Sequence, residues 1–522
     1  MHRQRFISNT VFLVLTSLVA QIVNLFVLPL FIENLGEEMY GIFILSGILL
    51  GYLNLLDFGF TQGLTRYIAR AHAEKDEEKL NEYIAAGFWL LTAVGLVAAA
   101  LIYFGRFAIV DFFNVTQANR TLAVNLLVVT AVLSIISWPS RLLPKIMDAT
   151  LHIKQIRIWD SFQAVTTSLV MLLLVYHAID IVSIKIATGS LAVASLLPKL
   201  LLVRRYVPQA KWQPLKFRFS RIREMSGFSL GMFYAGLLSV VALRMDHIII
   251  GRMLSLSMIA PYVVAAKLFE LCKRYTTAAI TAMLPTVYNL QGEKDANRLQ
   301  TLLNDGVRYR ALLFTPMAYL GIVVSPAFIR TWMGPEYVQY AIWSRLFLVV
   351  FLLTPPGMAK NMAKGLGHLK LCNGVTTAGT LTNLTISIAL IPRFGIGGPM
   401  LGTIVMYIVF GEYVFSPFYC KISGLAWRKL YFDALKITTA NLPVMVAGIW
   451  IERMLAIDGW IPLIAFSAIT GTTLGVVLFF VFVRDREKRD IFTACQCLGI
   501  TRIPLFGTII HKWLIPGSTT VP

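Results

Sequence analysis

Long apolar runs separated by short polar segments repeat along the whole chain. The first run, from Ser8 to Leu30, contains no charged residue. It is long enough to cross a bilayer, because a membrane helix needs roughly 20 apolar residues. Similar runs follow at intervals, and their spacing supports the weaker ones. We therefore predict about fourteen membrane-spanning helices, at 8–31, 41–65, 84–105, 121–140, 159–177, 181–203, 225–250, 259–289, 309–329, 341–359, 371–391, 396–419, 436–452 and 459–483.

The composition indicates a protein whose solvent is largely lipid. Of its 522 residues, 57% are hydrophobic and 14% are charged, whereas soluble domains carry about a quarter charged residues. A chain this apolar lacks the polar residues to cover a soluble surface. The predicted fold class is therefore all-α integral membrane, and the functions of soluble domains are excluded.

Lysine and arginine alternate in abundance from one predicted loop to the next. With the N-terminus in the cytoplasm, the cytoplasmic segments carry about five times as many of them as the opposite segments, in agreement with the positive-inside rule. An even number of spans then leaves both termini cytoplasmic. This bias explains the net charge of +20 without nucleic acid. The basic segment from Lys211 to Arg223 favours the anionic headgroups of membrane lipids.

A short motif occurs twice in the chain. Glu74-Lys75-Asp76 with Leu80 recurs as Glu293-Lys294-Asp295 with Leu299, each time after a predicted span. The two copies keep the same orientation, which predicts parallel repeats, and two such lobes around a central cleft are typical of alternating-access transporters. We predict an N-terminal six-helix lobe (1–205), a basic cytoplasmic linker (206–224), a C-terminal six-helix lobe (225–421), helices 13 and 14 (422–483) and a cytoplasmic tail (484–522).

The segment from Pro29 to Tyr67 covers the end of the first predicted helix, the next loop and the second helix. Its characteristic elements are Pro29, Leu35-Gly36, Tyr40-Gly41, Asp57-Phe58-Gly59 and Arg66-Tyr67. Together with the chain length and the predicted plan of spans, this segment resembles the polysaccharide (O-antigen type, Wzx-like) flippases of the multidrug/oligosaccharidyl-lipid/polysaccharide exporter superfamily. The lipid II flippases and the multidrug antiporters of that superfamily share the plan.

This resemblance implies a function and a set of partners. It implies translocation of a polyprenyl-diphosphate-linked oligosaccharide across the bacterial inner (cytoplasmic) membrane, for biosynthesis of a surface polysaccharide such as the O-antigen of lipopolysaccharide. The implied partners are the lipid-linked oligosaccharide, membrane lipids and polysaccharide assembly proteins. A cationic cleft and coupling to protons or another ion are implied as well. We expect no cofactor, no catalytic residue and no metal, since the five cysteines lack metal-ligand spacing.

Charged residues inside predicted spans are the candidates for the transport site, because a charge in the membrane is costly and usually functional. The eighth predicted span carries Lys267, Glu270, Lys273 and Arg274. At 100° per residue, Lys267, Glu270 and Arg274 share one face of this helix. With Arg244 of the preceding span, we expect these cations to attract the diphosphate of the substrate. Alternatively, Glu270 pairs with Lys267 and Arg274, and the charges only hold helices together.

Polar groups on three other spans are further candidates. On the first span, Gln21 and Asn24 either line the cleft and bind sugar hydroxyls or hold neighbouring helices together. Asp57 on the second span and Glu412 on the twelfth are carboxylates inside spans and are candidates for ion coupling. For Asp57, the alternative is a structural kink at Asp-Phe-Gly.

Two other functions compete with the flippase interpretation. A drug or metabolite antiporter of the same superfamily would need a pocket with buried acids, and the cations of the eighth span disfavour organic cations as cargo. A membrane enzyme acting on polyprenyl-linked glycans would need a large outer loop or an acidic surface motif, and the sequence has neither. We therefore expect a transporter and not an enzyme. Tryptophans near span ends, including Trp138 and Trp332, are expected in the interfacial belt.

Overall fold

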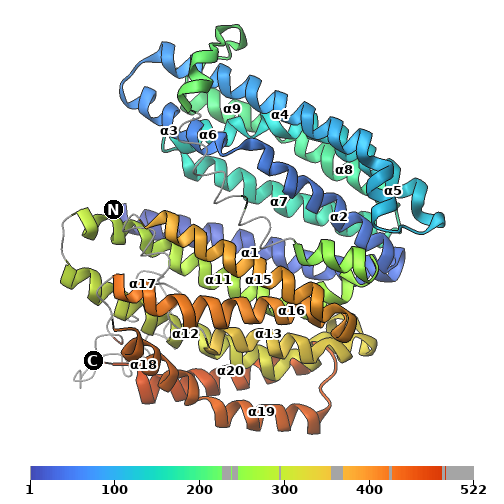
Figure 1. The fold of residues 1–522 in the computed structure, drawn as a ribbon, viewed down its shortest axis with the longest axis vertical. Helices are drawn as coiled ribbons and strands as arrows, with labels where there is room; N and C mark the ends of the chain where they lie inside the picture. The colour runs from blue at the N-terminus through green and yellow to red at the C-terminus, as the bar shows by residue number, and fades with distance from the viewer. Residues whose placement is uncertain are drawn as a thin grey trace, which may run out of the picture. The chain divides into compact units, whose positions relative to one another are not determined.

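The described part of the protein is built from helices and turns. The computed structural model describes residues 2–225, 237, 245–292, 296–353, 368–422, 426–484 and 488, and these residues contain no strand. The predicted all-α class is thus confirmed. The chain divides into two compact units, a first unit of residues 15–263 and 376–403 and a second unit of residues 1–14, 264–375 and 404–522. Figure 1 shows that helices run side by side within each unit.

The helices of the first half of the chain follow one another with short connections. In chain order they are α1 (His2–Leu35), α2 (Glu37–Leu53), η1 (Asn54–Asp57), α3 (Phe60–Ala73), α4 (Glu77–Phe112), α5 (Gln117–Ser140), α6 (Leu142–Ala149), α7 (Ile153–Tyr176), α8 (Ile181–Ala194), α9 (Leu196–Tyr206) and η2 (Pro214–Lys216).

The second half has the same character. Its helices are α11 (Ile259–Gly292), α12 (Ala296–Met333), η3 (Pro335–Tyr340), α13 (Ala341–Leu353), α15 (Leu369–Phe394), α16 (Gly397–Val405), the π-helix η4 (Met406–Phe415), α17 (Ser416–Ile422), α18 (Trp427–Thr439), α19 (Leu442–Leu455) and α20 (Trp460–Phe482).

Many of these helices have the dimensions of membrane spans. Ten helical segments in the described part of the chain are long and apolar enough to cross a membrane. The protein is therefore a multi-span membrane protein, while the count of about fourteen spans stays a prediction. The ten segments are Glu77–Phe112, Gln117–Ala149, Ile153–Tyr176, Ile181–Tyr206, Asn304–Met333, Pro335–Leu353, Lys370–Phe394, Gly397–Lys421, Trp427–Leu455 and Trp460–Phe482.

The second predicted span, 41–65, is not one continuous helix. Helix α2 ends at Leu53, a short 3-10 turn follows, and α3 begins at Phe60. Phe58 and Gly59 have left-handed backbone φ angles of 48° and 76°. Such angles are unusual for a residue other than glycine and end a regular helix. The break separates an apolar segment from the polar α3.

Close packing of α4 against α5 organises the first unit. A Cβ atom added to Gly95 of α4 would lie 2.9 Å from the Cβ of Trp138 and 3.2 Å from the carbonyl oxygen of Ser134. Small residues permit this kind of close approach between membrane helices. Trp138 is fully buried in the core of this unit. Trp138 therefore packs inside the protein, and Trp332, which is 4% exposed, is likewise buried, while their level relative to the membrane interface stays a prediction.

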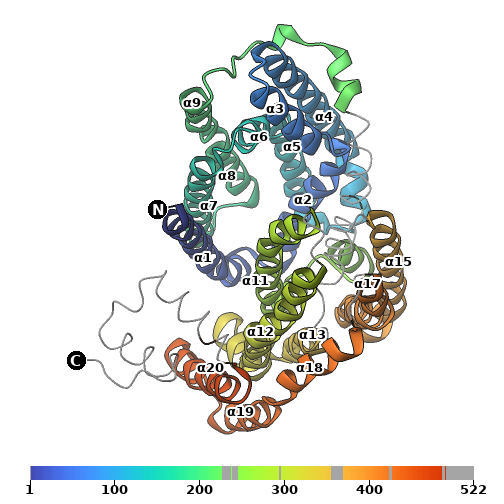
Figure 2. The same ribbon diagram turned by 90° about the vertical axis from the view of Figure 1, so that its left-hand side faces the viewer.

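Helix α12 is the central element of the second unit. It packs against α13, α18, α19 and α20, as Figure 2 shows, and its apolar window is the most buried of the ten described segments. The hydroxyl of Tyr319 donates a 2.9 Å hydrogen bond to the carbonyl of Thr438 on α18. This bond ties the middle of α12 to a neighbouring helix through a backbone group.

We predict that Gly95→Val destabilises the first unit by about 1–3 kcal/mol, because the new methyl groups have no room between α4 and α5. Thermal unfolding in detergent, followed by tryptophan fluorescence, measures the effect. The matched control is Gly105→Val on the same helix, where an added Cβ meets only Ile109 at an ordinary 3.6 Å. Equal unfolding temperatures for the two variants would contradict the packing argument.

Candidate substrate site

Helix α11 has two chemically different faces. On one face, Phe269 stacks on Phe347 of α13 with ring centroids 4.0 Å apart, and Cys272 and Thr276 are buried beside it. The charged residues lie on the opposite face, since Lys267 is about 160° from Phe269 around the helix. Apolar packing therefore fixes the helix while its charged face stays clear of the core.

The three residues of this charged face are Lys267, Glu270 and Arg274. They occupy about 60° of the helix circumference and span about 10 Å along it. Glu270 and Arg274 are exposed, and Lys267 is half-buried. Lys267 lies roughly 12 Å and Arg274 roughly 22 Å from the start of α11, so both lie well inside this 34-residue helix.

The charges on α11 are not neutralised by ion pairs within the described part of the chain. None of Lys267, Glu270, Lys273 and Arg274 has a carboxylate or cationic partner within 4.0 Å there. Lys267 and Arg274 interact with Glu270 only through space. The alternative that intrahelical pairs hold these charges thus has no direct contact to support it.

Aromatic rings, rather than carboxylates, lie next to the two lysines. The ammonium nitrogen of Lys267 lies 5.8 Å from the ring centroid of Trp332. That of Lys273 lies 5.8 Å from Phe269 and 5.5 Å from Tyr407. The face of an aromatic ring attracts a cation without cancelling its charge. Both lysines therefore have aromatic rings nearby that do not neutralise them as an ion pair would.

Two other predicted substrate contacts lie on α1. Asn24 donates a 2.9 Å hydrogen bond to the hydroxyl of Ser168 on α7 and a 2.8 Å bond to the carbonyl of Ala20. Its amide thus joins two helices, although the residue is also exposed. Gln21, one turn earlier, is half-buried. Arg244, the remaining predicted cation, lies outside the described residues.

Asp57 lies at the break between α2 and α3. One of its carboxylate oxygens accepts a 2.9 Å hydrogen bond from the backbone N–H of Thr61, so it satisfies an otherwise open donor at the start of α3. Its charge also interacts with that of Arg141, whose guanidinium lies 3.9 Å from the ring of Trp138. This geometry gives Asp57 a structural task at the helix break.

Glu412 is almost fully buried in the π-helix η4, at 1% exposure. Its carboxylate accepts a 3.2 Å hydrogen bond from the indole of Trp427, and its charge interacts with that of Arg310 on α12. π-helical turns occur frequently at functional sites. If Glu412 binds a proton, its negative charge is lost and the buried Arg310 no longer faces this counter-charge.

Arg310 is a residue that the sequence pattern did not single out. It lies at the start of a predicted span and two positions after Arg308, so it resembles part of the adjoining polar segment. In the structure it is only 9% exposed. Its position inside the predicted span 309–329 is the available signal, but its partner on η4 cannot be identified from the sequence.

A second buried charge pair lies in the same unit. Glu452 on α19 is 3% exposed, and its carboxylate lies 4.0 Å from the guanidinium of Arg345 on α13. Arg345 also donates a 3.0 Å hydrogen bond to the carbonyl of Ile322 on α12. This pair joins three helices and resembles a structural contact more than a binding site. In the described residues, no group of three or more His, Cys, Asp or Glu side chains could hold a metal ion.

Comparison with protein families gives one match that covers more than half of the chain. A family model described as "Polysaccharide biosynthesis protein" matches residues 35–342. This match includes most of the motif between Pro29 and Tyr67 and extends into the second unit.

Individual relatives agree with this match. The chain is 24% identical over 500 residues to the "Uncharacterized membrane protein EpsK" of Bacillus subtilis, covering 91% of this chain and 94% of the relative. It is 24% identical over 275 residues to the "Putative O-antigen transporter" of Salmonella typhi, covering 52% of this chain and 62% of the relative.

Among solved structures, the lipid II flippase MurJ in an inward closed conformation has the same fold. The TM-score is 0.72 at 16% identity, and the alignment covers 91% of this chain and 99% of that chain. The resemblance to the flippases of this superfamily is confirmed by the family, the relatives and the fold together.

We predict that Glu412→Ala destabilises the second unit by about 3 kcal/mol or more, because it leaves the buried Arg310 without this counter-charge. Glu412→Gln, which keeps an acceptor for Trp427, should lose less. Urea unfolding monitored by tryptophan fluorescence measures both. Asp433→Ala on α18 is the control, since Asp433 is more than half exposed and pairs with Lys436 at 3.9 Å. A loss for Glu412→Ala no larger than for this control would count against a stabilising buried pair.

Proposed function

We propose a function for this chain from one premise: it belongs to the polysaccharide biosynthesis protein family. The protein translocates a polyprenyl-diphosphate-linked oligosaccharide across the bacterial inner membrane, as a step in the synthesis of a surface polysaccharide. The Salmonella relative is named as an O-antigen transporter, and the MurJ structure is that of a lipid II flippase. They support the same class of substrate here.

The observation that carries this proposal is the charged face of α11. Lys267, Arg274 and the neighbouring Lys273 bring three positive charges against the single carboxylate of Glu270, and no close ion pair within the described residues consumes them. A substrate diphosphate brings about two negative charges into a medium where an isolated ion is strongly disfavoured. Fixed cations along its path lower that barrier.

The geometry suits a diphosphate rather than a single carboxylate. The charged face is about 10 Å long. Lys267 and Arg274 can therefore contact the two phosphates of one diphosphate, or contact the diphosphate one after the other as it moves along the helix. Arg274 offers a planar fork that suits bidentate phosphate binding, while Lys267 acts as a point charge. In the proposed mechanism, Arg244, Gln21 and Asn24 contribute further contacts to the diphosphate and to sugar hydroxyls.

Alternating access of two lobes around a cationic cleft completes the proposed mechanism. The lobes are those expected from the sequence, 1–205 and 225–421, joined by the linker 206–224 and followed by 422–483. The excess of cations on α11 favours an anionic cargo over the organic cations of a drug antiporter. Lipid-linked oligosaccharide and membrane lipids are the proposed partners, together with polysaccharide assembly proteins, and both termini face the cytoplasm.

The direct test is the distribution of polyprenyl-linked oligosaccharide between leaflets in a strain that lacks this protein. Access of a periplasmic lectin or glycosidase reports the outer leaflet. We expect the glycan to accumulate on the cytoplasmic side and to be released by re-expression. Normal glycan export with unchanged surface polymer would show that the cargo is another molecule.

We predict that Lys267→Gln and Arg274→Gln each lower translocation at least tenfold while the protein still accumulates in the membrane, because each removes a charge that faces the diphosphate. Lys436→Gln on α18 is the matched control, because this lysine is 72% exposed and pairs with Asp433 on its own helix. The lectin-access assay measures all three. Normal export by both α11 variants would refute the proposed role of this face.

We predict that proton coupling, if it passes through Glu412, disappears in Glu412→Gln, because an amide cannot bind and release a proton. Transport into proteoliposomes with and without an imposed pH gradient measures this. Asp57→Asn is tested in parallel and should keep gradient dependence if Asp57 only caps α3. Gradient-independent transport by the wild-type protein would exclude proton coupling through either residue.

A further inference from the structure

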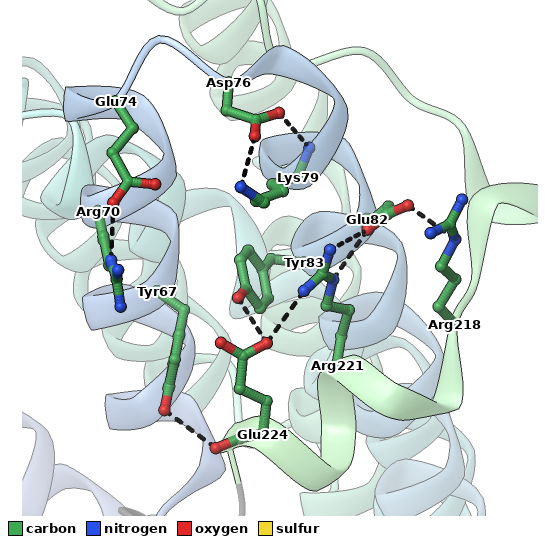
Figure 3. A network of polar contacts seen from close by, with 10 residues as sticks. All are labelled: Tyr67, Arg70, Glu74, Asp76, Lys79, Glu82, Tyr83, Arg218, Arg221 and Glu224. Carbon is green, nitrogen blue, oxygen red and sulfur yellow. Dashed lines mark hydrogen bonds and ion pairs between the residues drawn. The ribbon is translucent and has the colours of Figure 1, made fainter.

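The basic segment between α9 and residue 225 folds back onto the start of α4 (Figure 3). This segment is the linker, 206–224, that the sequence predicts. The buried amide of Asn81 accepts a 2.7 Å hydrogen bond from the backbone N–H of Lys211 and donates a 3.0 Å bond to the carbonyl of Gln209. The N-terminal part of the linker is thereby attached to α4 about one turn after the start of that helix.

The C-terminal part of the linker is attached to the same turn of α4 by ion pairs. Glu82 is only 2% exposed and forms 2.8 Å ion pairs with both Arg218 and Arg221. Arg221 also pairs with Glu224 at 3.1 Å, and the hydroxyl of Tyr83 donates to the same carboxylate at 2.9 Å. Two sets of contacts, one at Asn81 and one at Glu82, therefore hold the linker as a closed loop against α4.

Between these two sets of contacts, the linker extends along α4 toward the middle of that helix. The indole of Trp89 donates a 2.9 Å hydrogen bond to the carbonyl of Pro214, and Trp212 packs edge-on against Phe88 with centroids 4.6 Å apart. Trp89 lies eight residues beyond Asn81, or about 12 Å along the helix. Helix α4 is one of the ten segments apolar enough to span a membrane.

The tip of this loop, residues 212–219, exposes large apolar side chains. Leu215 is 95% exposed, Phe219 is 69% exposed and Trp212 is 52% exposed. Lysines flank them: Lys211 pairs with Glu77 at 3.3 Å, whereas Lys216 has no carboxylate partner within 4.0 Å in the described residues. A soluble loop would gain nothing by presenting leucine and phenylalanine in this way.

We propose that the tip of the linker is a membrane anchor that inserts into the interfacial region of the leaflet next to the N-terminal end of α4. Leu215, Phe217 and Phe219 enter the boundary between headgroups and acyl chains, and Lys216 binds the phosphates of anionic lipids. The occupant is lipid because Trp89, which holds the tip, lies on an apolar membrane helix and is itself 45% exposed. Tryptophan at such a level and cations beside it are typical of membrane interfaces.

The anchor is separate from the charged face of α11, since every contact that fixes the tip lies within the first unit. Its loss would release the tip from the bilayer without removing a cation from the proposed substrate path. The anchor therefore does not depend on which molecule the protein transports.

The test places a nitroxide spin label at the tip of the full-length protein in lipid nanodiscs. The variant Leu215→Cys is made in a Cys495→Ser, Cys497→Ser background, in which the described cysteines are buried. Two controls use the same background: Lys75→Cys in the exposed turn before α4, and Phe104→Cys, at a position that is 78% exposed on α4. Accessibility to oxygen and to a water-soluble nickel chelate gives the depth of each label.

We expect the label at position 215 to lie roughly 5–10 Å below the phosphates, the depth of interfacial apolar segments, between the values at Lys75 and Phe104. Nickel accessibility equal to that at Lys75 would overturn the proposal. Adding phosphatidylglycerol to phosphatidylcholine nanodiscs should deepen the label, and Lys216→Gln should abolish that increase. The same depth in both lipids would overturn the assignment of Lys216 to anionic headgroups.

Discussion

The cost of leaving a polar group without a partner in lipid governs this structure. Backbone N–H and C=O groups must be satisfied inside each membrane segment, which leaves helices as the available element. Charged side chains obey the same rule. Glu412 lies opposite Arg310, and Glu452 lies beside Arg345, so the deeply buried acids of the second unit have cations nearby. The charged face of α11 departs from this rule. Charged residues inside a membrane span that lack such partners are costly, and they usually have a function.

Helix α11 combines rigidity with an uncompensated charge. The stack of Phe269 on Phe347 fixes its rotation, and the ring of Trp332 restrains Lys267 from the side. A cation held by an aromatic ring costs little reorganisation when an anion arrives, whereas a cation held by a carboxylate must first break an ion pair. Under the proposed function, this arrangement favours rapid exchange of the substrate diphosphate over tight retention.

The sequence predicts a large part of this protein because the relevant signals are local. Apolar run lengths give the helices, and a motif of some 40 residues gives the family. The spacing of Lys267, Glu270 and Arg274 gives their shared face. Other features depend on contacts between distant residues. Trp138 stands near a span end, yet it is buried because Gly95 lets α5 approach α4. The role of Arg310 depends on Glu412, about a hundred residues away, and no periodicity reveals it. The helix break after Leu53 goes with the left-handed backbone of Phe58 and Gly59. It lies inside the predicted span 41–65, which the apolar pattern predicts as one continuous helix.

The network around Glu82 has a consequence for biogenesis. The hydrogen-bond and ion-pair partners on α3 and α4 of Lys211, Pro214, Arg221 and Glu224, from Tyr67 to Trp89, precede the linker in the chain. Once Glu224 has left the ribosome, these bonds can form without any residue of the second half. These bonds are made by residues 67–224 alone, so a substitution in a later helix leaves every partner of these bonds in the chain.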